Sequence, residues 1–106
     1  MKEEIGRFIE YLHVEKQISK NTEVSYERDM KKMCQYLKWQ EIQRVEAVTA
    51  TSLNSYVLYL EQNGMKPATI SRSIASMKAF FAYLYKQHKI DTDPAENLKA
   101  PRIEKK

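Results

Sequence analysis

The sequence lacks the features that would place it outside the cell or in a membrane. It has one cysteine, Cys34, which excludes an intramolecular disulfide and a zinc cluster. Cys34 falls among Met30, Met33 and Leu37 at helical spacing, so we expect a small buried side chain in a reduced setting. No apolar run approaches the length of a membrane span, and the first residues lack the hydrophobic segment of a signal peptide. We therefore expect a cytoplasmic protein with no membrane partner.

Acidic residues are missing from the whole stretch between Gln62 and Ile90, although the 106-residue chain contains 14 of them. The cations in this stretch are Lys66, Arg72, Lys78, Lys86 and Lys89. Because most of the stretch has the apolar spacing of one amphipathic helix, these cations should lie on a rigid rod. Rods that carry charge of one sign usually face polyanions. Nucleic acid is therefore the first expected partner, in keeping with a net charge of +4.

Apolar residues recur at helical spacing in the first half of the chain. The pattern predicts a first helix from about Glu3 to Lys16. A second helix should begin after Ser19, whose hydroxyl suits the N-cap position, and should end near Trp39, where the periodicity stops.

Two further helices follow, and both have clear boundary signals. Thr49 is the expected cap of the third helix, which should stop at Asn63-Gly64 because glycine readily adopts a left-handed conformation. The fourth helix should begin at Pro67, since proline is tolerated in the first turn, and should reach about Gln87. Asp93 followed by Pro94 predicts a short final turn through Leu98. The chain shows no strand-like alternation, which predicts an all-α bundle of four main helices.

A polar stripe runs along the second helix. Asn21, Ser25, Arg28 and Lys32 follow one another at helical spacing, beside the apolar stripe. Amides and hydroxyls can bond phosphates or base edges, and the two cations can neutralise phosphate charge. The positive end of the helix at Ser19 would also attract phosphate oxygens.

The fourth helix carries a similar stripe of Thr69, Arg72, Ser73 and Ser76, with Lys66 at its start. Short side chains would let the helix approach base edges in a groove roughly 12 Å wide. Stripes of serine and threonine also occur on plain surfaces and at close contacts between helices. On the residues alone, both interpretations remain open.

Four segments in order resemble one family. Ile18–Met30, Thr69–Ile74, Phe80–Leu84 and Asp93–Ala95 resemble parts of the N-terminal core-binding domain of tyrosine recombinases, which include phage integrases and Xer-type enzymes. The likeness covers nearly the whole chain. It implies a SAM-like orthogonal bundle of four main helices plus a short C-terminal helical turn. In the family this domain grips one side of the recombination site, and a separate catalytic domain closes on the other.

The resemblance implies that the second and fourth helices face double-stranded DNA. Together with the stripes it gives one set of expected DNA-binding residues: Ser19, Lys20, Asn21, Thr22, Ser25, Arg28, Lys32, Lys66, Thr69, Arg72, Ser73 and Ser76. The parent protein would work as a tetramer on paired sites, whereas this chain is expected to be a monomer. We expect no cofactor, no metal and no small-molecule substrate. We also expect Arg72 to serve DNA binding rather than the fold.

A tyrosine recombinase also needs a nucleophilic tyrosine, arginines that stabilise the phosphorane, and a proton-transferring histidine or lysine. The only histidines are His13 and His88, and the residues three positions later are Lys16 and Asp91, so the His-x-x-Arg element of the family is missing. We therefore expect no DNA cleavage by this chain. Residues 1–98 would form the DNA-binding domain, and residues 99–106 would be a linker toward an absent catalytic domain.

A different class of function remains as the alternative. Small helical bundles also serve as protein-interaction or oligomerisation modules. An apolar patch that includes Trp39, Val57 or Leu58 would be the expected contact surface.

Overall fold

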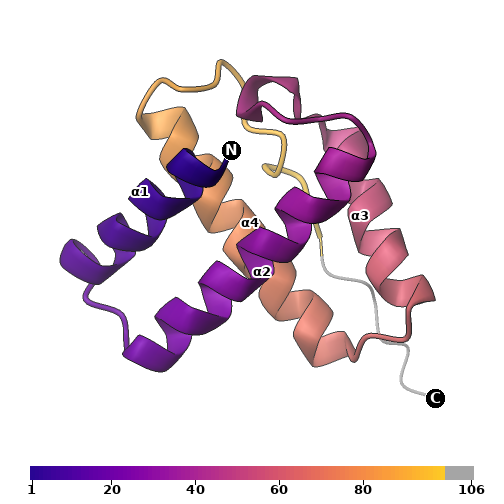
Figure 1. The fold of residues 1–106 in the computed structure, drawn as a ribbon, viewed down its shortest axis with the longest axis horizontal. Helices are drawn as coiled ribbons and strands as arrows, with labels where there is room; N and C mark the ends of the chain where they lie inside the picture. The colour runs from indigo at the N-terminus through magenta and orange to yellow at the C-terminus, as the bar shows by residue number, and fades with distance from the viewer. Residues whose placement is uncertain (100–106) are drawn as a thin grey trace.

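The computed structural model describes residues 1–99 of the chain and is drawn in Figure 1. Within these residues every regular element is helical and no strand is present, which confirms the all-α prediction. The elements are α1 (Lys2–Val14), α2 (Lys20–Trp39), the short 3₁₀ helix η1 (Val45–Ala47), α3 (Ala50–Gln62) and α4 (Pro67–Lys86).

The predicted helix starts are confirmed by the caps. The Ser19 hydroxyl accepts a hydrogen bond from the Thr22 backbone N–H at 3.2 Å. The Thr49 hydroxyl accepts one from the Ser52 N–H at 3.1 Å. Pro67 occupies the first turn of α4, where its missing N–H has no intrahelical partner to lose.

Three helices end in the same way, with one residue in the left-handed conformation. These residues are Glu41 at φ 62°, Gly64 at φ 72° and His88 at φ 59°. In each case the N–H of the next residue returns to a carbonyl in the last helical turn, which defines a Schellman motif. The three closing bonds are Ile42 N–H to Leu37 O at 2.8 Å, Met65 N–H to Leu60 O at 3.1 Å and Lys89 N–H to Leu84 O at 3.0 Å.

The predicted ends of two elements differ slightly from the structure. Helix α1 stops at Val14, two residues early, since Gln17 takes a φ of 48° and the Ile18 N–H bonds back to Leu12. The expected final turn is built from hydrogen-bonded turns rather than a regular helix. The Asp93 carboxylate accepts a bond from the Ala95 N–H at 3.0 Å and so caps this segment, as predicted.

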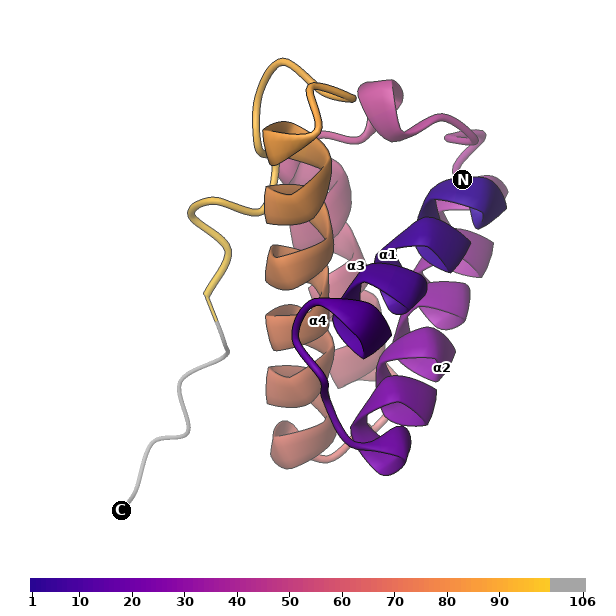
Figure 2. The same cartoon turned by 90° about the vertical axis from the view of Figure 1, so that its left-hand side faces the viewer.

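Helices α2 and α4 cross, with α1 on one flank and α3 on the other (Figure 1). Both α2 and α4 begin at the same end of the molecule, the lower end in Figures 1 and 2. Beyond α4 the chain turns back and runs along the side of α4 that is away from α1 (Figure 2). Lys78 holds this returning segment, because its ammonium group donates to the Leu98 carbonyl at 2.9 Å.

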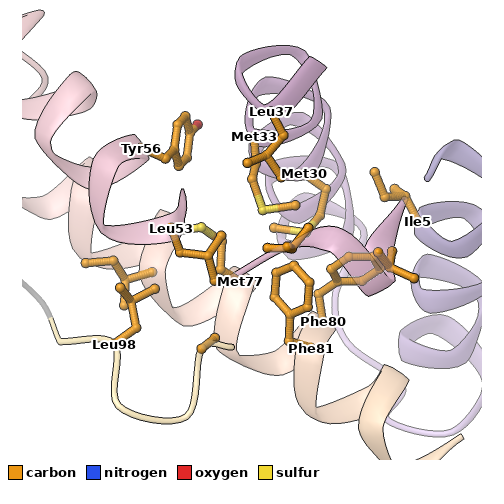
Figure 3. Close-up of a cluster of buried hydrophobic side chains, with 14 of the residues drawn as sticks. Ile5, Met30, Met33, Leu37, Leu53, Tyr56, Met77, Phe80, Phe81 and Leu98 are labelled. Carbon is orange, nitrogen blue, oxygen red and sulfur yellow. The ribbon is translucent and has the colours of Figure 1, made fainter. Parts of the chain in front are cut away.

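One hydrophobic core receives side chains from all four helices and from the returning segment (Figure 3). Phe8 of α1 meets Phe80 of α4 edge to face, with ring centroids 5.4 Å apart. Several methionines, including Met33 and Met77, fill the irregular space between the aromatic rings. Cys34 is only partly buried, so the prediction of a buried cysteine was wrong.

Tyr56 carries a buried polar atom that has no partner. The Tyr56 hydroxyl makes no hydrogen bond to any described residue, although its ring packs 5.2 Å from that of Tyr36. Burial raises the pKa of the Tyr56 phenol, and the negative charge of Asp29 raises it further. The neutral phenol is therefore the form that the fold accommodates.

The left-handed residue at the end of α4 gives a first prediction. His88→Gly should raise the free energy of unfolding by about 0.5–1 kcal/mol, because glycine adopts this conformation without the steric cost of a Cβ atom. Denaturant unfolding measures the change. Gly64→Ala is the reverse substitution at an equivalent position and should lower the free energy of unfolding by about 1 kcal/mol. No atom lies near the added Cβ at Gly64, so the backbone conformation would be the cause of the loss. A destabilised His88→Gly protein would contradict the argument.

Tyr56 gives a prediction about alkaline pH. The unfolded phenol titrates at about pH 10, whereas the folded one holds its proton to higher pH, so stability is complete below pH 10 and falls above it. The contribution of this group should fall by up to about 1.4 kcal/mol per pH unit. Tyr56→Phe should therefore become progressively more stable than the wild type above about pH 10. Tyr85→Phe, at an exposed tyrosine, is the control and should leave the pH dependence unchanged.

Candidate nucleic-acid interface

The polar stripe of α2 lies on the surface, on the flank next to Asp29. Asn21, Arg28 and Lys32 are exposed, and Ser25 is half-buried. Ser25 precedes Asp29 by one turn and Lys32 follows it by one turn, so the stripe runs alongside this carboxylate.

At the start of α2 the hydroxyl groups serve the helix itself. Ser19 accepts the Thr22 N–H, and its own O–H donates to the Thr22 hydroxyl at 2.9 Å. Lys20 is exposed, and the backbone N–H groups of Lys20 and Asn21 have no intrahelical acceptor. This end can therefore offer one ammonium group and two N–H donors to an anion.

The start of α4 is similar but has no side-chain cap. Lys66 occupies the N-cap position, is exposed, and makes no capping hydrogen bond through its side chain. Thr69 is half-buried within the first turn. The N–H groups of this turn lie at the same end of the molecule as those of α2 (Figures 1 and 2).

Ser73 and Ser76 do not lie on the surface, which corrects the sequence prediction. Ser73 is 4% exposed and Ser76 is fully buried, with its hydroxyl donating to the Ser73 carbonyl at 2.8 Å. Their small size allows close packing of α4 against its neighbours. The spacing contained a signal for Ser73, since it lies one turn after Ile70 and one turn before Met77, both in the core stripe. We exclude both serines from the interface.

Arg72 is joined to Asp29 by two hydrogen bonds, which sequence reasoning missed. Its Nε and Nη2 groups donate to the two carboxylate oxygens, each at 3.0 Å. The Asp29 side chain is 4% exposed, and that of Arg72 is 42% exposed. These bonds raise the pKa of the Arg72 guanidinium. Arg72 therefore also compensates a buried charge, a role that the sequence prediction did not assign to it.

The ion pair joins the flanks of α2 and α4 that carry the two stripes. It links α2 to α4 beside Ser25 on one helix and Thr69 on the other. We call this region the α2–α4 surface. It consists of Ser19, Lys20, Asn21, Thr22, Ser25, Arg28, Lys32, Lys66, Thr69 and Arg72. None of its members is acidic, and five of them are cations.

The remaining cations of the acid-free stretch lie elsewhere. Lys78 is bound to the Leu98 carbonyl on another side of α4. Lys86 is in the last turn of α4, where a cation suits the negative end of the helix. The concentration of positive charge in this part of the sequence therefore does not form one patch in space.

A groove of about 530 Å³ lies between α1 and α2, on a different flank of α2 from the α2–α4 surface. Lys2, Lys31 and Lys38 surround its floor, which includes Ile5 and Cys34. Within residues 1–99 no three His, Cys, Asp or Glu side chains are grouped as metal ligands would be. None of the helices in this range is both long and apolar enough to span a bilayer.

Comparisons with known proteins identify a family whose model covers most of the chain. Residues 5–88 match the family model described as phage integrase, N-terminal SAM-like domain. The comparison with solved structures gave no match.

Relatives cover nearly all of this chain. A candidate tyrosine recombinase of Caldanaerobacter subterraneus subsp. tengcongensis is 41% identical over 102 residues, which is 96% of this chain and 35% of that protein. The tyrosine recombinase XerC of Herpetosiphon aurantiacus is 30% identical, over 99% of this chain and 34% of its own length. XerD of Rickettsia bellii is 29% identical, over 96% of this chain and 33% of its own length.

The chain thus spans about a third of the length of the relatives it matches. The family model covers most of the sequence, and the structure has the all-helical architecture that the family name implies. The chain belongs to the family of N-terminal SAM-like domains of phage integrases and tyrosine recombinases.

Proposed function

We propose that this chain is the DNA-binding domain of a site-specific tyrosine recombinase and that it grips duplex DNA with the α2–α4 surface. The observation that carries the proposal is the union of two stripes by the Asp29–Arg72 pair. The pair joins the flanks of two helices that are remote in the sequence, and the ten residues of the α2–α4 surface include no acid.

The chemistry of the surface suits a phosphate backbone. Lys20, Arg28, Lys32 and Lys66 supply mobile charges that can neutralise phosphates, and Asn21 can reach a phosphate or a base edge. Two helix N-termini add backbone N–H donors and the positive end of the helix dipole. Such contacts give affinity that depends on salt, because DNA releases condensed counterions when phosphates are neutralised.

The relatives are named recombinases, and this chain matches about a third of their length. We propose that the chain supplies DNA binding without cleavage and that it is a monomer by itself. Recombination by a tetramer on paired sites would then depend on a catalytic domain. His13 is hydrogen-bonded to Glu23 at 2.9 Å, and His88 closes the end of α4, so the fold already accounts for the position of both histidines.

Removing two cations from the α2–α4 surface tests the proposal. The double variant Arg28→Ala/Lys32→Ala should lower the slope of log affinity against log salt by about 1.8, since each phosphate contact contributes about 0.9. Its affinity for a duplex of arbitrary sequence should fall by about tenfold or more near 0.1 M salt. Fluorescence anisotropy over a series of salt concentrations measures both quantities.

The matched control removes the same charge from the same helix. Lys31 and Lys38 are exposed and line the groove between α1 and α2. Lys31→Ala/Lys38→Ala should change the salt slope much less than the surface variant does. Equal effects of the two double variants would mean that only net charge matters, and the proposed surface would be rejected.

One observation favours a second candidate function, a protein-interaction module. Trp39 is 60% exposed beside Tyr59, and Leu58 is 56% exposed. Val57, which the sequence suggested for the same patch, is buried and cannot take part.

Sedimentation velocity over a range of protein concentrations, without DNA, tests this second candidate. An interaction module of this kind should self-associate, and Trp39→Ser together with Leu58→Ser should abolish the association while leaving DNA affinity unchanged. A protein that stays monomeric at high concentration would remove self-association as its function.

A further inference from the structure

We propose that Asp29 is a positioning residue for DNA binding: its buried carboxylate holds the Arg72 guanidinium so that the free edge of the guanidinium meets a phosphate. This inference rests on the proposed DNA-binding function and adds a role for a residue that no stripe contained.

The geometry leaves Arg72 with donors to spare. A guanidinium has five N–H donors in one plane, and the bonds to Asp29 use the Nε–H and one Nη2–H. Three N–H groups remain, two on Nη1 and one on Nη2. Because the group is planar and rigid, fixing one edge also fixes the direction of the other.

The unequal burial of the pair determines which partner is the anchor. Asp29 is almost fully enclosed, while the Arg72 side chain is 42% exposed. The carboxylate therefore holds the guanidinium from the protein side, and the exposed share of the pair belongs to Arg72, which carries the unused donors. A phosphate oxygen is a good acceptor for such a fork, because both bonds would be charge-assisted.

Holding the side chain in advance should increase affinity. A free arginine loses rotamer freedom when it binds, whereas Arg72 loses it when the protein folds. Immobilising one long side chain corresponds to about tenfold in affinity. Lys20, Arg28, Lys32 and Lys66 have no comparable clamp among the ion pairs of the described residues, so Arg72 would be the fixed point of the surface.

Asp29→Asn separates positioning from simple electrostatics, because the two predict opposite signs. Asparagine removes a negative charge close to the DNA, so electrostatics alone predicts tighter binding. Positioning predicts the reverse: the variant should bind a duplex of arbitrary sequence about tenfold more weakly, since Arg72 becomes mobile. Anisotropy titrations at low temperature, with circular dichroism to verify the fold, give the comparison.

Glu27→Gln is the matched control. Glu27 lies two residues before Asp29 on the same helix, and Glu27→Gln changes the net charge by the same amount as Asp29→Asn. The Glu27 side chain, however, lines the groove between α1 and α2 and pairs weakly with Lys31 at 4.0 Å. This variant should bind as tightly as the wild type or slightly more tightly. An Asp29→Asn protein that binds as tightly as Glu27→Gln would overturn the inference.

Two further measurements apply even if Asp29→Asn fails to fold. Arg72→Lys keeps the charge but not the planar fork, and should also lose about tenfold in affinity. In the wild-type protein, the Arg72 Nε–Hε resonance should be visible without DNA and should shift during a titration with duplex DNA. A resonance that stays unmoved while the amides of Asn21 and Ser25 shift would overturn the role of Arg72 and Asp29.

Failure of the inference differs from failure of the proposed function. The α2–α4 surface itself is rejected if the wild type shows no salt-dependent binding. It is also rejected if Arg28→Ala/Lys32→Ala and Lys31→Ala/Lys38→Ala change the salt slope equally. If those tests succeed and Asp29→Asn binds as well as the wild type, only the positioning role is lost.

Discussion

The buried carboxylate of Asp29 constrains the rest of this structure more than any other polar group. A charge that is 4% exposed is costly unless it is paired, and Arg72 pairs it through two hydrogen bonds. The two residues are 43 positions apart, so the pair joins α2 directly to α4. The crossing of these helices is therefore set by directional bonds as well as by apolar packing.

The core of the bundle combines small and large side chains. Ser73 and Ser76 put small side chains into a buried face of α4, and Ser76 satisfies its hydroxyl within its own helix. Methionines and edge-to-face phenylalanines fill the larger spaces. Ser25 and Thr69 are half-buried within one turn of the Asp29–Arg72 pair, and the cations proposed for DNA binding are exposed.

The distribution of charge in the sequence was a poor guide to where the cations lie in space. The acid-free stretch places five cations on or near one helix. Helical geometry directs Lys66 and Arg72 toward the α2–α4 surface, while Lys78 ties down the returning segment and Lys86 ends α4. Two of the cations proposed for binding, Arg28 and Lys32, come from outside this stretch. A surface is thus assembled from flanks of helices, not from segments of sequence.

The sequence by itself determined the helices and most of their boundaries. Ser19, Thr49, Pro67 and Gly64 act within one or two turns, so their effect can be read without knowing the fold. The family could also be recognised from ordered local motifs.

Only the tertiary structure decided which polar residues are buried and which are available. Ser73, Ser76 and Val57 became part of the core, Cys34 came to line a groove, and Arg72 gained a partner from another helix. The physical reason is that burial and ion pairing depend on contacts between residues distant in the chain, whereas caps and periodicity depend on near neighbours.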